Sequence, residues 1–309
     1  MADAFGRGDA APSPAVPRRK ARRRRDWTPE LFSLPALLAV LAVMGFPLVY
    51  LCWMSLQRWS MVGFDPPRFV GLRNFELLAG DDRFVGALGR TFWFTLLGLA
   101  SNLPLGLGIA LLMHERFPGR SICRALLILP MVATPAAMGL VWVIMLDPTL
   151  GIVRYLLGSV GIAQPPLWLA DPDLVVPTLV AVDAWMWTPM VALICIAGLA
   201  ALPTEPFEAA LVDGASALQR FRYLTLPMMM STLMVAAMLR LMDLLKLIDI
   251  VYVMTGGGPG HLSETVNLYN YLAALSYDKI GYGAAIALVL FAIVMACTLV
   301  LIRLRRPSW

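Results

Sequence analysis

Four charged residues recur at every third position within an otherwise apolar stretch of the chain. Arg240, Asp243, Lys246 and Asp249 alternate in sign. Side chains three apart on a helix are neighbours and can pair. Ionisable groups within an apolar span usually face the protein interior or a water-filled cavity. The pattern has two interpretations: a self-neutralising packing feature in which Asp249 reaches water at the outer end, or a cavity for a polar solute lined by Asp243 and Lys246.

A second group of residues in the apolar run 174–202 could serve the same chemistry. Asp183, Trp185 and Trp187 combine a carboxylate with two large aromatic rings. Polar solutes such as sugars are held by a few polar groups beside apolar and aromatic surface. These three residues could therefore complete a cavity with Asp243 and Lys246. The two tryptophans could instead be interface anchors or packing residues.

A third chemically rich segment, EAALVDGASALQRFRYLTLP (208–227), separates two apolar runs. Thr204 can cap a helix start, and Glu205 and Glu208 suit the positive end of the helix dipole. Gly214 predicts either a bend or a close backbone contact. The apolar residues that follow at helical spacing form one stripe: Phe207, Leu211, Ala215 and Leu218. We predict a short amphipathic helix followed by an elbow, all within 204–227.

The sign of the charges on this segment distinguishes two possible contacts. A helix that rests on a membrane surface carries Lys and Arg along its polar face. The segment instead begins with Glu205, Glu208 and Asp213, which anionic lipid repels. Its apolar ridge therefore favours insertion into a groove of a partner protein, with the acids paired to the partner's bases. A connector lying along the membrane is the alternative.

The elements that must position these residues are membrane-spanning helices. The chain has 309 residues, of which 59% are hydrophobic and 15% charged, with a mean hydropathy of +0.73. A soluble domain has about 25% charged residues. Six apolar runs are long enough to cross a bilayer: 31–56, 84–113, 122–146, 174–202, 226–254 and 282–302. We predict an all-α polytopic membrane protein whose prolines kink helices, with Gly106 and Gly108 as helix-packing residues.

Orientation follows from the basic residues, which concentrate on the cytoplasmic side of a membrane. The N-terminus carries RRKARRRR at 18–25, and the chain ends with RLRRPSW. Arginines also cluster at 114–124 and 220–222, whereas the first outer loop carries several that count in the opposite direction. We predict a disordered basic cytoplasmic tail at 1–26, a transmembrane domain at 27–309, and both termini in the cytoplasm.

Several other chemistries are disfavoured. The sequence has no GxxxxGK[ST], GxSxG or HExxH motif, so nucleotide and peptide-bond hydrolysis are not expected of this chain. Two histidines and four dispersed cysteines leave little basis for a metal site. The basic tails and loops are not the footprint of a nucleic-acid-binding face. The glycine-rich segment Thr255, Gly256, Gly257, Gly258 and Pro259 predicts an outer turn. A phosphate-binding loop is disfavoured, because no Lys follows these glycines.

Three motifs give the chain a family resemblance. Glu208-Ala209-Ala210, Asp213-Gly214-Ala215 and the later Leu226-Pro227 resemble the EAA signature of binding-protein-dependent ABC importer permeases. The stretch IDIVYVMTGGGPG (248–260) resembles that of maltose and glycerol-3-phosphate permeases, with Ile248 in place of the usual Phe. GYGAA (281–285) resembles the family's entry to the last span. The resemblance runs from about residue 31 to the C-terminus.

The resemblance implies a fold and a division of labour. The fold would be that of a type I ABC importer permease in the bacterial inner membrane. The partners would be a second permease, usually a different chain, an ATPase dimer that holds ATP and Mg²⁺, and an extracytoplasmic solute-binding protein. This chain would then need no cofactor. The residues implied in coupling to the ATPase are Glu208, Ala209, Ala210, Asp213, Gly214, Ala215 and Leu218.

The function expected from this resemblance is import of a sugar, polyol or sugar phosphate. An importer for amino acids, peptides or another small solute is an alternative within the class. A secondary transporter acting alone is a second alternative, although the sequence shows no inverted halves and six spans are few for such a carrier. A membrane scaffold or receptor whose cytoplasmic helix only recruits a partner is a third.

Overall fold

The computed structural model describes residues 28–60, 66–115, 117–162 and 164–304. The predicted tail at 1–26 lies outside the described residues. The predicted all-α class is confirmed, since the strands in the described part are only β1 (Gln57–Arg58) and β2 (Arg68–Phe69). These two form an antiparallel pair in which Gln57 lies opposite Phe69.

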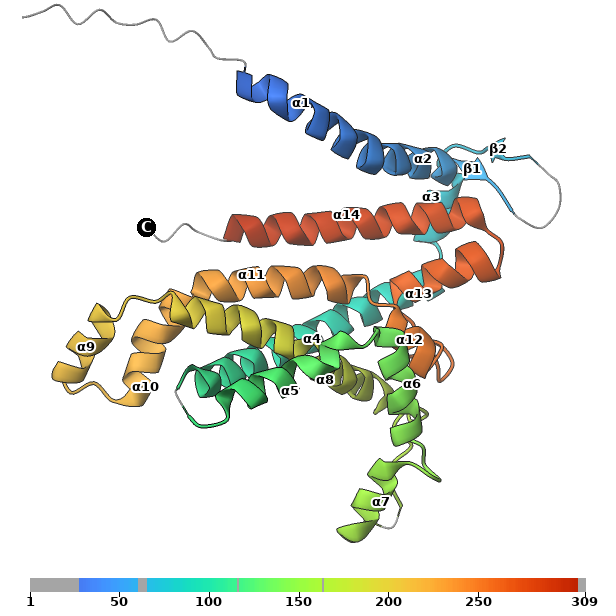
Figure 1. Ribbon diagram of the computed structural model, residues 1–309. Helices are drawn as coiled ribbons and strands as arrows, with labels where there is room; N and C mark the ends of the chain where they lie inside the picture. The colour runs from blue at the N-terminus through green and yellow to red at the C-terminus, as the bar shows by residue number, and fades with distance from the viewer. Residues whose placement is uncertain (1–27, 61–65, 116, 163, 305–309) are drawn as a thin grey trace, which may run out of the picture. The chain divides into compact units, whose positions relative to one another are not determined.

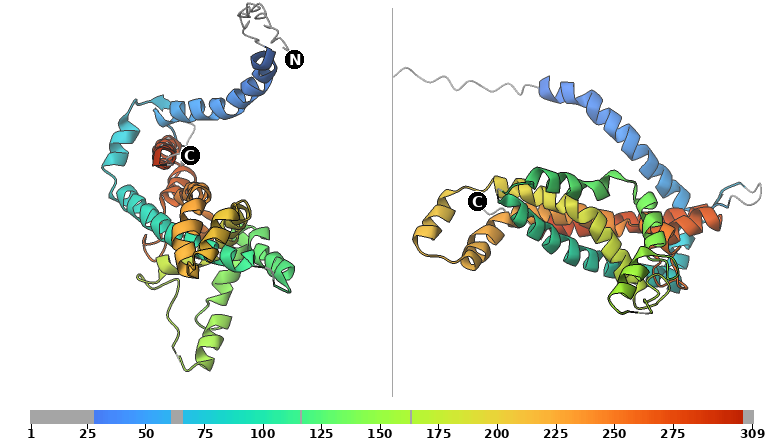
Figure 2. Two further views of the ribbon diagram at one scale, coloured as in Figure 1. Left: turned by 90° about the vertical axis from the view of Figure 1, so that its left-hand side faces the viewer. Right: turned by 60° about the horizontal axis from the view of Figure 1, so that its bottom comes forward.

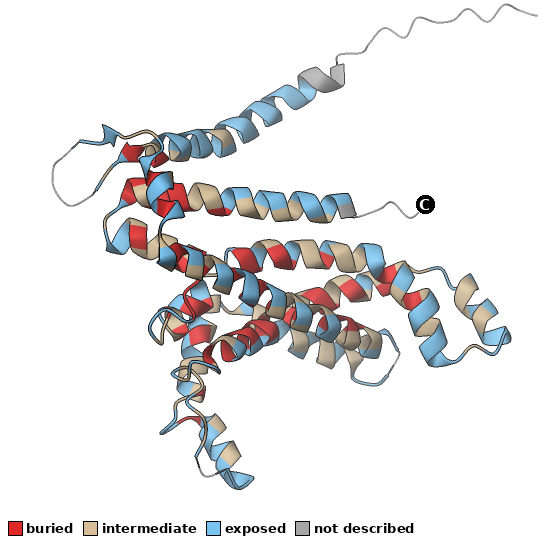
Figure 3. Cartoon of the chain, turned by 180° about the vertical axis from the view of Figure 1, so that it is seen from behind, coloured by how far each residue is buried: buried red, intermediate tan, exposed pale blue. Residues whose placement is uncertain are grey.

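The chain divides into two compact units, residues 1–49 and 50–309. In the first, α1 (Thr28–Val40) continues through a π-helical turn (Leu41–Gly45) into α2 (Phe46–Ser55), which crosses the boundary between the units. The most apolar 18 residues of the helical stretch Phe32–Ser55 include no buried residue, and almost all of the stretch is coloured as exposed in Figure 3. A helix that is apolar all round and covered by no protein is suited to contact with lipid. The first predicted span is thus confirmed as a helix over Phe32–Ser55.

The second unit contains the remaining helices (Figure 1). They are α3 (Arg73–Ala79), α4 (Asp82–His114), α5 (Arg120–Val132), α6 (Pro135–Met145), α7 (Ile152–Ser159), α8 (Val175–Ala200), α9 (Glu205–Val212), α10 (Ala217–Arg220), α11 (Leu226–Leu245), α12 (Asp249–Met254), α13 (Val266–Tyr271) and α14 (Ile280–Leu304). Five helical stretches in the described residues are long and apolar enough to cross a membrane, or six if one bent pair counts as a single span.

The bent pair corrects the prediction of one helix over 122–146. α5 and α6 meet at 97°, and the backbone is extended at Ala133 and Thr134, with ψ of 152° and 143°. Pro135 causes the break, because proline disfavours helical geometry in the residue before it and has no N–H to continue the helix. Pro130 lies within α5 without ending it.

The prediction of one helix over 226–254 was also wrong at both ends. The helix starts earlier, since α10, a π-helical turn (Phe221–Thr225) and α11 run on as one stretch from Ala217 to Leu245. It stops at Lys246, and α12 begins separately at Asp249. Asn267 Nδ2 donates to the carbonyl of Lys246 at 2.6 Å, and Thr265 Oγ1 donates to that of Leu247 at 2.8 Å. These side chains satisfy carbonyls that the broken helix leaves free.

α8 is the innermost span, since 61% of its most apolar window is buried, against 17% for α14. It packs along α4, where a Cβ on Gly106 would lie 2.5 Å from Val191 Cγ1. Gly108 meets no other atom within 4 Å, so only Gly106 is confirmed as a packing glycine. At the entry to the last span, a Cβ on Gly281 would overlap the carbonyl oxygen of Gln57, which explains the need for glycine there.

Candidate functional site

A buried ion pair joins α11 to α8 in the core of the second unit. Arg240 Nη2 donates to Asp183 Oδ2, and the two side chains are 1% and 0% exposed. Asn102 Nδ2, from α4, donates to the same carboxylate oxygen at 3.3 Å. The Arg240 guanidinium also lies 5.5 Å from the centroid of the Trp187 ring. Removing charges from water is costly unless such partners compensate, so this cluster fixes three helices relative to one another.

The predicted charge series along the fifth span pairs only in part, between Arg240 and Asp243. Asp243 Oδ2 lies 3.9 Å from Arg240 Nη1, and its side chain is 48% exposed. Lys246 and Asp249 are exposed and form no ion pair within the part of the chain that the structure describes. The main partner of Arg240 is instead Asp183, 57 positions away, which the three-residue spacing could not indicate.

The five residues predicted to line a solute cavity fall into three places. Asp183, Trp187 and Asp243 surround Arg240, whereas Lys246 ends α11. Trp185 is 42% exposed and packs edge-to-face on Trp142 of α6, with ring centroids 5.5 Å apart. It lines an open groove of about 1170 Å³ between α4, α5 and α8, together with polar residues such as Ser101 and Thr188.

The segment at 204–227 contains two short helices, α9 and α10, which meet at a turn and together form the elbow. α9 begins after Thr204, whose carbonyl accepts the amides of Phe207 and Glu208 at 3.0 Å. The expected cap by the Thr204 side chain is absent. Gly214 has a φ of +76°, and Ser216 then opens α10 with a reciprocal capping box to Gln219. α9 and α10 extend beyond the ends of α8 and α11 (Figure 2).

The turn at Gly214 corrects the predicted apolar stripe. Ala215 and Leu218 lie beyond the turn, so they do not continue the helical face that carries Phe207 and Leu211. Glu208, Ala209 and Asp213 are exposed, and Ala210 is partly buried. Three apolar side chains are left uncovered by the described chain: Leu211 (56% exposed), Val212 (89%) and Leu218 (73%).

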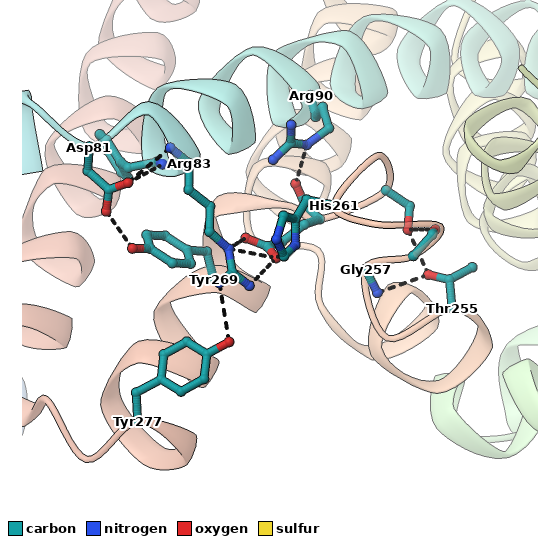
Figure 4. A network of polar contacts seen from close by, with 12 residues as sticks. Asp81, Arg83, Arg90, Thr255, Gly257, His261, Tyr269 and Tyr277 are labelled. Carbon is teal, nitrogen blue, oxygen red and sulfur yellow. Dashed lines mark hydrogen bonds and ion pairs between the residues drawn. The ribbon is translucent and has the colours of Figure 1, made fainter. Parts of the chain in front are cut away.

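The glycine-rich segment after α12 folds as the predicted turn. Gly256, Gly257 and Gly260 have φ of +59°, +93° and +59°, which other residues rarely adopt. Thr255 Oγ1 lies 2.8 Å from Ser263 Oγ, which donates to the carbonyl of Gly258 at 2.7 Å. These contacts close the turn on itself (Figure 4), and a Cβ on Gly257 would lie 3.2 Å from Glu264 Cβ.

Glu264 and Asp81 organise the polar network around this turn (Figure 4). Glu264 is 1% exposed, accepts from Arg83 Nη2 at 2.7 Å and Nε at 3.0 Å, and lies 3.1 Å from His261 Nδ1. Burial opposes ionisation of Asp81, but hydrogen bonds from Tyr269, Tyr282 and the amides of Phe84 and Arg83 lower the pKa of that carboxyl. Burial and the Asp81 hydrogen bond raise the pKa of Tyr269 to about 12.

Sequence reasoning did not single out Glu264, Arg83 or Asp81. Arg83 and Glu264 are 181 positions apart, so no local spacing connects them. The only local signal was at Asp81, which precedes an apolar run and accepts from Arg83 N at 2.9 Å and Phe84 N at 3.3 Å as an N-cap.

Known proteins are similar to this chain in sequence and in fold. Residues 102–306 match the family described as "Binding-protein-dependent transport system inner membrane component". The probable ABC transporter permease protein y4oQ of Sinorhizobium fredii is 36% identical over 293 residues, 94% of each chain. The trehalose/maltose transport system permease protein MalF of Thermococcus litoralis is 35% identical, over 89% of this chain and 92% of that protein.

Two further matches extend the comparison. The sulfoquinovosyl glycerol transport system permease protein SmoG of Agrobacterium fabrum is 30% identical over 90% of each chain. The crystal structure of a bacterial ABC transporter involved in the import of alginate superposes with a TM-score of 0.79, covering 92% of this chain and 97% of its counterpart at 21% identity. The predicted type I permease fold is thereby confirmed. The chain belongs to the family of binding-protein-dependent transport system inner membrane components, as an ABC importer permease.

Proposed function

We propose that this permease imports a sugar, polyol or sugar phosphate. The observation that carries the proposal is the similarity to relatives named for trehalose/maltose and for sulfoquinovosyl glycerol, at 35% and 30% identity over about nine-tenths of this chain. The IDIVYVMTGGGPG stretch (248–260), similar to that of carbohydrate permeases, supports the same solute class.

The energy for transport would come from a separate ATPase dimer, with ATP and Mg²⁺ held there and no cofactor in this chain. The elbow formed by α9 and α10 would be the joint to that ATPase. Its uncovered Leu211, Val212 and Leu218 support this role, because several large apolar side chains exposed on one short segment favour an interaction site. The acids Glu208 and Asp213 beside them would pair with basic groups of the partner. A second permease, of different sequence, and an extracytoplasmic solute-binding protein would complete the importer.

Among the predicted pathway residues, those with exposed surface are the better candidates to touch solute. Asp243, Lys246 and Trp185 are exposed, whereas Asp183 is fully buried against Arg240. Asp183 and Trp187 would then act indirectly, by holding the Arg240 guanidinium beside Asp243. The solute would meet a carboxylate whose position is fixed by a buried pair.

Substitution of Asp243 tests this pathway. We expect Asp243→Ala to abolish uptake of labelled sugar by cells while the variant still co-purifies with the ATPase. An exposed carboxylate that lies neither in the groove beside Trp185 nor in the Arg240 cluster, Glu76→Ala on α3, is the matched control and should keep uptake. If Asp243→Ala instead reduces assembly with the ATPase, and uptake falls only as far as the amount of assembled transporter falls, the residue has a packing role.

Purification and reconstitution separate the competing functions. An importer subunit should co-purify with an ATPase and a second permease. Uptake by the chain alone, driven by a proton or sodium gradient, would identify a secondary transporter. Recruitment of a partner without any solute flux in the reconstituted assembly would identify a scaffold or receptor.

A further inference from the structure

A polar cavity of about 900 Å³ lies where α4 and α14 begin. Its walls come from the end of β1, from α3, from the first turns of α4 and α14, and from Tyr269 on α13. The charged residues of the lining are four cations and two carboxylates: Arg58, Arg73, Arg83, Lys279, Asp81 and Asp82. The cavity is separate from the Arg240 cluster and from the elbow, and the transport function does not account for it.

Both oxygens of the Asp81 carboxylate already accept hydrogen bonds from neighbouring groups. Its Oδ1 accepts the amides of Arg83 at 2.9 Å and Phe84 at 3.3 Å, and its Oδ2 accepts the hydroxyls of Tyr269 and Tyr282. Arg83 is likewise engaged, because it pairs with buried Glu264, which does not line the cavity. Neither residue is therefore free to bind the other groups of the lining, although the Asp81 carboxylate keeps its negative charge and offsets one cation.

Three cations remain at the cavity. Arg58, Arg73 and Lys279 are exposed, and none has a carboxylate oxygen within 4.0 Å among residues 28–60, 66–115, 117–162 and 164–304. Asp82 also lines the cavity and is exposed, so with Asp81 it offsets two of these three charges. The unpaired groups of the cavity therefore leave a net positive charge, which attracts an anion.

Exposed apolar side chains adjoin these cations. Phe69 on β2, Leu72 just before α3 and Leu77 on α3 are 72%, 64% and 56% exposed. Trp59 and Tyr277 add aromatic rings to the lining itself. Apolar side chains that enter the acyl region, basic groups beside them and aromatic residues at headgroup depth together characterise contact with an anionic membrane surface. The cavity also lies at the ends of two candidate spans, where headgroups are expected.

We propose that this cavity binds the phosphate of an anionic phospholipid headgroup. Arg58, Arg73 and Lys279 would contact the phosphate oxygens, and the acyl chains would lie along Phe69, Leu72 and Leu77. The exposed apolar residues favour lipid over an acidic surface of a partner protein, because docking a soluble protein onto the cations alone would leave these residues facing water. A bound lipid would tie β1, α3 and the start of α14 to the bilayer surface.

Native mass spectrometry of the assembled transporter in mild detergent tests the proposal. The complex is titrated with phosphatidylglycerol, with zwitterionic phosphatidylcholine of the same acyl chains, and with inorganic phosphate as a competitor. We expect tighter binding of phosphatidylglycerol than of phosphatidylcholine, and no displacement by phosphate at millimolar concentration. Equal binding of the two lipids would overturn the assignment to a lipid headgroup. Displacement of phosphatidylglycerol by millimolar free phosphate would overturn it as well.

A matched pair of arginines tests the position of the site. Arg73 lines the cavity, whereas Arg68 on β2 is an equally charged, exposed residue that does not. We expect Arg73→Gln to weaken phosphatidylglycerol binding about fivefold, and Lys279→Gln to do the same, while Arg68→Gln has a smaller effect. Equal losses for Arg68→Gln and Arg73→Gln would show general attraction without a site. Unchanged lipid binding with weakened capture of the solute-binding protein would assign the cavity to a protein partner.

Discussion

Arg240 is held in the interior by three groups on two helices. It donates to Asp183 on α8, lies over the ring of Trp187 on the same helix, and reaches toward Asp243 on its own helix. A charge buried in this way is stable only while its partner remains, because an unpaired ion in the interior has lost its hydration without compensation. The pair therefore should matter for folding, and the exposed Asp243 for contact with solute.

A double substitution separates the charge of this pair from its shape. Asp183→Asn or Arg240→Met alone should lower the stability of the purified transporter by about 3–5 kcal/mol, because each leaves one buried charge unpaired. The double variant should recover most of that loss. Thermal unfolding in detergent measures all three, with Asp243→Asn, on the half-exposed partner at 3.9 Å, as a control that changes stability by less than about 1 kcal/mol. Additive losses in the double variant would contradict this account.

Two glycines on α4 give a second contrast. A Cβ on Gly106 would lie 2.5 Å from Val191 Cγ1 and 3.1 Å from the backbone nitrogen of Ala192, whereas a Cβ on Gly108 would meet no atom within 4 Å. Gly106→Ala should cost about 1–3 kcal/mol by forcing α4 from α8. Gly108→Ala should be neutral or stabilising by up to about 1 kcal/mol, because alanine favours a helix. The same unfolding measurement distinguishes them, and equal effects would refute the packing role.

At the residue scale, the sequence indicated which side chains carry chemistry but not which of them meet. The spacing of Arg240 and Asp243 predicted a contact that the structure shows only at 3.9 Å. The pairs Arg240–Asp183 and Arg83–Glu264 join residues 57 and 181 positions apart. Such pairs depend on how helices pack, and neither helical periodicity nor local charge pattern contains that information.

At the element scale, breaks in helices were predictable where a local cause exists. Pro135 signals the bend between α5 and α6, although Pro130 has the same local signature and does not end α5. The stop of α11 at Lys246 has no proline or glycine to mark it. Asn267 and Thr265 bind the freed carbonyls there, and they arrive from the segment that leads into α13. A break stabilised by a distant segment leaves no local mark in the sequence.

The elbow is the element whose geometry should matter most for transport. Gly214 turns the chain at a φ of +76°, where an L-residue is strained by about 1–2 kcal/mol. Gly214→Ala should therefore alter the angle between α9 and α10 and lower solute-stimulated ATP hydrolysis by the reconstituted transporter. Gly119→Ala is the matched control, since Gly119 has a φ of +87° and open space around it in a different loop.

The two glycine variants must assemble equally for this comparison to be valid, which gel filtration of the complexes verifies. Full stimulation in Gly214→Ala would exclude a role for the elbow angle in coupling. An equal loss in Gly119→Ala would show that backbone strain in any loop near the membrane reduces the ATPase rate, and that the elbow has no special part.

At the scale of the whole molecule, composition was sufficient for the class. The apolar runs gave the number of spans, and the described helices reproduce them once the bent pair α5–α6 is taken as one crossing. Six crossings are an even number and would return the C-terminus to the side of the N-terminus. The cytoplasmic placement of both ends remains a prediction, because it depends on the basic residues of the tails.

The central claim is that the elbow contacts an ATP-hydrolysing partner. A photoreactive amino acid placed at Val212, on the elbow, and separately at Leu150, before α7, compares two side chains that are 89% and 92% exposed and are predicted to lie on opposite sides of the membrane. Illumination of cells that carry the assembled importer should crosslink position 212, and not position 150, to the ATPase subunit. Crosslinks from position 212 to lipid alone, or an ATPase adduct from position 150, would contradict the account.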